Sequence, residues 1–168
     1  FRSGSQSTES GKTIATAAMR LVSAYPTVAD ASSYASKLLT PSGKSDVMRF
    51  TVTATGDNGI NLNSIGLKAS YDYNATSTGA EIVIEDASAL GTNLATTTAV
   101  YGTSGTAVGV SFANQVEIAK GVTKTFVVFA DNTGSATTGN YFRVDMVNAN
   151  WTWNDGTVSG SYPLTGTH

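Results

Sequence analysis

Apolar and polar residues alternate through most of the chain from Met48 onwards. Between residues 48 and 54 every second residue is apolar and the residues between are Arg or Thr. This period of two predicts a strand with one buried face. The stretch ends at Gly56-Asp57-Asn58-Gly59, where Asn-Gly favours a turn with positive φ.

Further short stretches rich in strand-forming residues follow, with turn-forming residues between them. They cover residues 60–63, 67–73, 80–85, 96–101, 108–112, 116–122, 140–147, 151–153 and 161–165. The stretch Lys124–Ala130, KTFVVFA, is apolar on both faces, as a central strand of a sheet would be. About nine to eleven short strands at regular spacing predict an all-β, immunoglobulin-like β-sandwich.

The segment Lys12–Val28 stands in front of these strands, and its period is ambiguous. Helical spacing relates Ile14, Ala18, Leu21 and Tyr25. Read as a strand, the segment is apolar on both faces, and Ile14, Ala18 and Val22 would share one of them. Pro26 is expected to end either element, because the residue before proline is pushed towards extended geometry. Periodicity alone leaves helix and strand open.

Length and composition indicate one secreted domain. A chain of 168 residues fits a single β-sandwich over residues 29–168, preceded by a polar Ser/Gly-rich leader and the extended segment within residues 1–28. Only 13% of the residues are charged, and a surface solvated by hydroxyls and amides suits secreted proteins and close lateral packing. Position 1 is Phe rather than Met, so the chain is expected to be either processed or cut from a longer one, and processing would agree with export. We therefore expect an extracellular or cell-surface location.

Several classes of function lack their signatures. The net charge of −2 argues against a broad basic footprint for nucleic acid. No apolar run approaches the roughly 18 residues of a membrane span. Cysteine is absent, and the single histidine, His168, is the last residue, so a nucleophile with its base is missing. We expect that the chain is not an enzyme.

Loop carboxylates and amides make calcium the metal that the chain suits best. Oxygen ligands could come from Asp57-Asn58, Glu85-Asp86, Asp131-Asn132 and Asn154-Asp155. None of these matches EF-hand spacing, and each is also explained as a turn former. We therefore expect no cofactor, with calcium as the remaining alternative.

Two aromatic residues and one sequon are further candidates. Trp151 and Trp153 share one face of a strand, where they would form either a stacking platform for sugars or part of the core or a subunit interface; the second reading is favoured. Asn74-Ala75-Thr76 matches the glycosylation sequon and falls in a predicted loop.

A set of short motifs resembles one family of surface proteins. The motifs are Tyr25-Pro26-Thr27-Val28, residues 48–54 (MRFTVTA), residues 121–131 (GVTKTFVVFAD), Trp153-Asn154-Asp155-Gly156 and Pro163-Leu164-Thr165-Gly166. Together they resemble the β-sandwich surface-protein modules of Parcubacteria-type, candidate-phyla bacteria. The resemblance implies a cell-surface sandwich used in long or repeated structures, in which the segment before Pro-Thr-Val is a strand that joins one unit to the next. It therefore favours strand over helix for Lys12–Val28.

These observations lead to two hypotheses of function. In the first, the chain is a structural subunit of an extracellular, pilus-like filament or surface layer, and Lys12–Val28 adds a strand to a neighbouring copy. The donor segment would place Ile14, Ala18, Leu21, Val22 and Tyr25 at the interface, and head-to-tail repetition would give a homopolymer. In the alternative, the chain is a carbohydrate-binding or adhesive module that uses Trp151 and Trp153.

Overall fold

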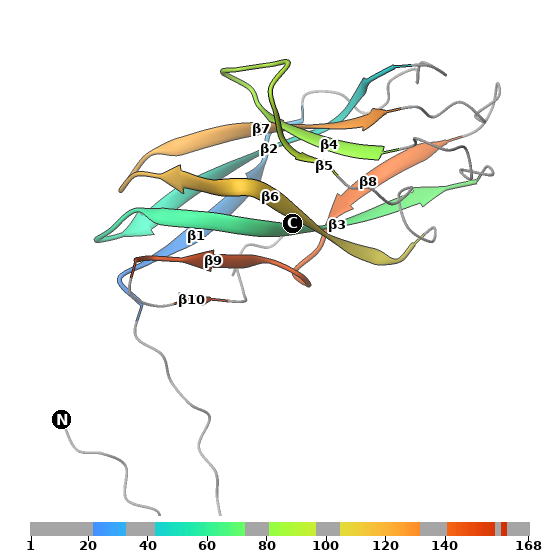
Figure 1. Cartoon of the computed structure of the whole chain (residues 1–168). Helices are drawn as coiled ribbons and strands as arrows, with labels where there is room; N and C mark the ends of the chain where they lie inside the picture. Colours follow the sequence, from blue (N-terminus) through green and yellow to red (C-terminus); the bar gives the residue numbers. More distant parts are fainter. Residues whose placement is uncertain are drawn as a thin grey trace, which may run out of the picture.

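The computed structural model describes residues 22–32, 43–72, 81–96, 105–131, 141–156 and 159–160. These residues form ten β-strands and no helix (Figure 1). The strands are β1 (Ala24–Asp30), β2 (Ser45–Gly56), β3 (Ile60–Tyr71), β4 (Glu81–Asp86), β5 (Asn93–Thr96), β6 (Ala107–Ile118), β7 (Thr123–Asp131), β8 (Phe142–Met146), β9 (Thr152–Asn154) and β10 (Ser159–Gly160). In this part of the chain no helix is long and apolar enough to cross a membrane.

The strands make two antiparallel sheets. The first has the order β1-β2-β7-β4-β5, and the second has the order β10-β9-β3-β6, with β8 also paired to β3. Apolar residues from both sheets are buried between them. The predicted all-β fold of two packed sheets is therefore confirmed. The prediction of a central strand at Lys124–Ala130 is also confirmed, since β7 pairs with β2 on one side and with β4 on the other.

The core is built from the alternating side chains of both sheets. Phe50 of β2 stacks on Phe126 of β7 with ring centroids 5.1 Å apart, and Phe112 of β6 reaches across from the other sheet to 6.1 Å from Phe126. All three rings are buried. Each buried side chain of this size contributes about 1.5–3 kcal/mol by leaving water, and the ring contacts add to that.

The sequence predicted two short strands where the structure has the single long strand β3. The reason is a bulge in its pairing with β6, where Leu62 faces Val116 and Ser64 faces Ser111. Across this bulge the core-facing positions of β3 change from even numbers (Ile60, Leu62) to odd numbers (Ile65, Leu67, Ala69). A bulge shifts the alternation by one residue, so a search for a strict period of two divides the strand.

The opposite edge of β3 carries an interrupted strand. Residues 142–146 of β8 pair with the second half of β3, and residues 152–154 of β9 pair with its first half. Between them residues 147–151 loop across Gly66, which has no side chain to obstruct the carbonyl oxygen of Ala149. The Trp151 indole N–H donates to the Val147 carbonyl at 2.9 Å, and the Ser64 hydroxyl donates to the Asn150 carbonyl at 2.8 Å. We refer to residues 147–151 as the crossing loop.

Candidate interaction surface

The strand β1 forms one edge of the first sheet. It pairs antiparallel with β2 from Ala24 opposite Gly56 to Asp30 opposite Phe50, and no other described strand pairs with its second edge. The prediction of a strand is thus confirmed for Ala24–Val28. The expectation that all of Lys12–Val28 leaves its own globule is wrong for this part, which pairs inside its own sandwich.

Backbone hydrogen bonds at both ends of β1 show which of its residues face β2. The Ser23 carbonyl accepts from the Asp57 N–H at 2.7 Å, and the Ala31 N–H donates to the Arg49 carbonyl at 2.9 Å. Because hydrogen-bonded residues alternate in an antiparallel pair, the odd-numbered residues bond to β2. The even-numbered residues direct their backbone groups to the open edge, and they are Ala24, Pro26, Val28 and Asp30.

Pro26 was expected to end the segment, but it lies inside β1. Its nitrogen faces the open edge, where it has no bond to β2 to break. Proline is tolerated in edge strands for this reason. The open edge therefore offers N–H groups at Ala24, Val28 and Asp30, with a gap in the donors at Pro26.

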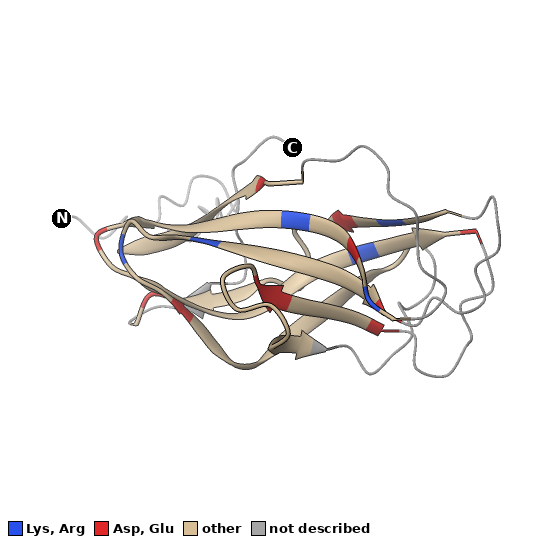
Figure 2. Cartoon of the chain, turned by 90° about the horizontal axis from the view of Figure 1, so that it is seen from above, with Lys and Arg blue, Asp and Glu red and all other residues tan. Residues whose placement is uncertain are grey.

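The outer face next to this edge is rich in threonine. Thr27, Thr53 and Thr123 lie opposite one another on β1, β2 and β7. Hydroxyl pairs link neighbouring strands, with Thr27 and Thr55 2.8 Å apart and Thr53 and Thr123 2.6 Å apart. Charged residues are few and scattered over the described strands in Figure 2. A neutral face of this kind packs against a neighbour without desolvating charges.

The chain enters β1 through a polar anchor to the second sheet. The buried Asp155, which follows β9, accepts two hydrogen bonds through Oδ2, from the Ser23 N–H at 2.8 Å and from the Ser23 hydroxyl at 2.7 Å. Gly56 permits the close approach, because a Cβ there would overlap the Ser23 carbonyl oxygen. The anchor fixes the start of β1 against the second sheet.

Replacing Asp155 by Ala is expected to loosen β1. The variant leaves the Ser23 donors without their buried acceptor, which costs about 1–3 kcal/mol. Amide hydrogen exchange in β1 should accelerate about tenfold or more, since 1.4 kcal/mol corresponds to a factor of ten. Asn58→Ala is the matched control, because it removes only the exposed 3.1 Å bond to the Ser23 hydroxyl. Equal exchange rates in the two variants would show that Asp155 does not anchor the strand.

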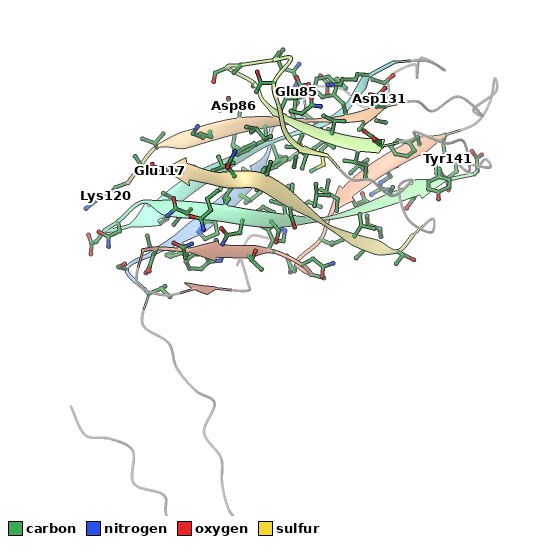
Figure 3. The ribbon with its side chains drawn as sticks, viewed as in Figure 1. Glu85, Asp86, Glu117, Lys120, Asp131 and Tyr141 are labelled. Carbon is green, nitrogen blue, oxygen red and sulfur yellow. The ribbon has the colours of Figure 1, made fainter. Side chains whose placement is uncertain are left out.

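Two acidic residues at the end of β4 have all their carboxylate oxygens occupied. Glu85 accepts from the Lys44 ammonium through Oε1 at 2.7 Å and from the Gly91 N–H through Oε2 at 2.6 Å. Asp86 accepts from the Ser88 N–H and hydroxyl through Oδ1, while Lys124 lies 3.3 Å from Oδ2. Glu85 and Asp86 lie together on the first sheet, well away from Tyr141 at one end and Lys120 at the other (Figure 3).

The hydrogen bonds to these carboxylates concern oxygens that the sequence offered as calcium ligands. Among the described residues no group of three or more His, Cys, Asp or Glu is placed to hold a metal ion. The loop oxygens expected to bind calcium instead accept hydrogen bonds from the protein at Glu85-Asp86 and at Asn154-Asp155. Asp57 pairs with Lys120 at 3.3 Å, and Asn132 lies outside the described residues.

The pKa of both carboxyls lies below its usual value. Burial opposes the charged form of each, but hydrogen bonds and a lysine outweigh it: Gly91 and Lys44 lower the pKa of Glu85, and Ser88 and Lys124 lower the pKa of Asp86. A lowered folded-state pKa gives stability that is present above the unfolded value and lost as the pH falls through the folded value.

Asp86→Asn should therefore reduce the acid sensitivity of the fold. The native chain gains stability from Asp86 above pH 3.8, its ordinary pKa, and loses it below that value. Urea unfolding at a pH above 3.8 and at a pH below it gives the free energy of unfolding under both conditions. This free energy should fall less for Asp86→Asn than for the native chain. Asp57→Asn is the control, since an exposed ion pair contributes little. An unchanged pH dependence in Asp86→Asn would contradict the role of this carboxyl.

The two tryptophans belong to the core. Trp151 is 1% exposed and Trp153 is 3% exposed, and both pack into the core cluster between the sheets. A flat exposed platform for sugars is therefore wrong for these residues. The pattern placed them on one face, and that face is the buried one.

Of the remaining candidate residues, only Val22 and Tyr25 lie in the part of the chain that the structure describes. Val22 is partly buried against the core, and Tyr25 is exposed on the outer face of β1. Ile14, Ala18, Leu21 and Asn74 lie outside the described residues. Sequence reasoning missed the anchor at Asp155 and the partners of Glu85. In each case the sequence alone did not distinguish an acidic residue with a structural partner from one that only forms a turn.

No family model, curated protein or solved structure matches this chain.

Proposed function

We propose that the chain is a structural subunit of an extracellular filament or surface layer, built on an immunoglobulin-like sandwich and joined by β-strand addition between copies. The open edge of β1 is the observation that carries the proposal. Its outward N–H and C=O groups have no strand partner in the described fold. An unprotected edge is a template for another strand, and strand addition is a common mode of peptide recognition.

The donor in this proposal is residues 12–21 of a neighbouring copy. Residues 24–28 are already paired with β2, so the part of the predicted donor segment left for donation lies upstream of Ser23. Residues 12–21 contain apolar side chains at alternating and at helical spacing, and no acidic residue. Head-to-tail addition produces an extended polymer when the rotation between copies does not close a ring.

Pro26 is consistent with an acceptor edge of limited affinity. It withholds one N–H from an added strand, while its carbonyl and the groups of Val28 and Asp30 stay available. Proline at an edge discourages indiscriminate pairing. The neutral threonine face beside the edge then adds contact area without desolvated charges.

Deleting residues 1–21 is expected to abolish assembly and leave the sandwich folded. The deletion preserves Ser23 and its two bonds to Asp155. Negative-stain electron microscopy and size-exclusion chromatography should show polymers for the full chain and monomers for the shortened one. A synthetic peptide of residues 12–21, added in excess, should block polymer growth by occupying the acceptor edge.

A matched pair of proline variants tests the acceptor edge. Asp30→Pro removes an outward N–H at an exposed residue and leaves the bonds to β2, whereas Thr27→Pro removes an N–H that faces β2. We expect Asp30→Pro to weaken assembly while circular dichroism stays native, and Thr27→Pro to weaken the fold itself. Polymers of normal length from the chain lacking residues 1–21 would overturn the proposed mechanism.

A further inference from the structure

A lysine, an asparagine and a buried glutamate from three segments of the first sheet meet in one cluster. Lys44 immediately precedes β2, Glu85 lies near the end of β4, and Asn93 begins β5. The Lys44 Nζ atom is 2.7 Å from Glu85 Oε1 and 2.7 Å from Asn93 Oδ1. The amine is thus held between a carboxylate and a carboxamide by residues far apart in the sequence.

The surroundings fix the Glu85 carboxylate and leave the Lys44 amine only partly exposed to solvent. Glu85 is 2% exposed, and the Gly91 N–H holds Oε2, which leaves Oε1 directed at Nζ. The Lys44 side chain is 34% exposed, and its Nζ lies 5.8 Å from the centre of the Phe129 ring. Asn93 is exposed, so its amide nitrogen has a path to solvent.

We propose that Lys44 and Asn93 form an intramolecular isopeptide bond, with Glu85 as the proton carrier. Glu85 accepts a proton from the Lys44 ammonium, and the neutral amine attacks Cγ of Asn93. A bond forms between Nζ and Cγ, and the bond between Cγ and Nδ2 breaks. Nζ enters with three protons and keeps one, and the two that it loses leave with Nδ2 as an ammonium ion. Glu85 ends as the carboxylate, and neither oxidant nor cofactor is consumed.

The geometry requires one local movement. Nζ now contacts the amide through its oxygen, whereas attack needs Nζ above the plane of the amide at about 3–3.5 Å from Cγ. Rotation about the last torsion of Asn93 turns that plane, and this torsion is broad in asparagine. The reaction happens once in the life of each chain, so a slow step is sufficient. Holding the partners together supplies a large effective concentration.

The bond would staple the sheet across its strands. It joins the chain beside β2 to β5, and β7 and β4 lie between these strands in the sheet. The two residues are 49 positions apart in the sequence, so a long loop of chain would be closed covalently. A staple of this kind is useful to an isolated monomer as well as to a polymer, and the inference does not rest on the proposed assembly.

Intact mass spectrometry of the purified full-length chain tests the inference. We expect a mass lower than the sequence mass by one ammonia, and a tryptic digest with a branched peptide that joins residue 44 to residue 93. Lys44→Arg keeps the positive charge beside Glu85 and Asn93 but has no amine that can form the bond. It should have its full sequence mass, as should Asn93→Ala.

Glu85→Gln separates the proton carrier from the reacting pair. It keeps the size of the side chain and an acceptor for the Gly91 N–H. We expect the cross-linked fraction to drop from essentially all chains in the native protein to few or none in this variant. If this variant does not fold, Lys44→Arg still decides the question, because its ion pair with Glu85 is retained. A native chain that stays at its sequence mass after prolonged incubation overturns the proposal. So does an ammonia loss that persists in Lys44→Arg.

Discussion

Gly66→Ala should be among the most destabilising single substitutions in this chain. A Cβ at this position would overlap the Ala149 carbonyl oxygen and lie 2.9 Å from the Val147 carbonyl oxygen. Both are backbone atoms, so the crossing loop has to move. Its movement would disturb the bond from the Val147 N–H to the Gly66 carbonyl at 3.1 Å and the indole bond of Trp151. We expect a loss of about 3 kcal/mol or more in the free energy of unfolding, at the upper end for overpacking.

The matched control for this variant is Gly121→Ala. Gly121 has φ of 68° and no atom near the position of an added Cβ, so alanine there introduces backbone strain alone, about 1 kcal/mol. Urea unfolding of both variants measures the difference. Similar losses in the two would mean that the crossing loop adapts to the added methyl group.

Trp151→Ala is expected to cost about 3–5 kcal/mol, as for other buried aromatic residues. The side chain is among the largest fully buried ones in the described structure, and its indole N–H satisfies the Val147 carbonyl. Truncation would leave both a cavity and an unpaired carbonyl. Thermal unfolding of the variant should begin well below that of the native chain.

Tyr141→Ala is the control for Trp151→Ala, because it removes an aromatic side chain that is 50% exposed. It should change the free energy of unfolding by less than about 0.5 kcal/mol, as most surface substitutions do. A Trp151→Ala variant as stable as Tyr141→Ala would contradict the assignment of Trp151 to the core.

The strands were predictable where the alternation is regular. The pattern at residues 48–54 and the two-sided apolar run at Lys124–Ala130 correspond to β2 and β7, because burial acts on each residue in turn. The prediction failed where a bulge shifts the alternation, as it does after Leu62. It also failed at Pro26, because a sequence does not show which strand lies at the edge of a sheet.

The contacts of the candidate surfaces were less predictable than the strands. Ser23 and Asp155 are 132 positions apart, and Lys44 and Glu85 are 41 apart. Such pairs depend on strand order and register, which follow from the whole fold rather than from a local pattern. Glycine at position 66 carried no signal of its own, since its function depends on a loop that arrives from residues 147–151.

The anchor at Ser23 also determines how the sandwich would bear a mechanical load. A pull applied at residue 22 along the axis of β1 would load its pairing with β2, from Ala24 to Asp30, in shear. In that geometry the hydrogen bonds of the pair must break together. A pull across the strand would instead open the bonds one after another, at a lower force. The antiparallel pairing of β1 with β2 therefore favours resistance to stretching along the strand.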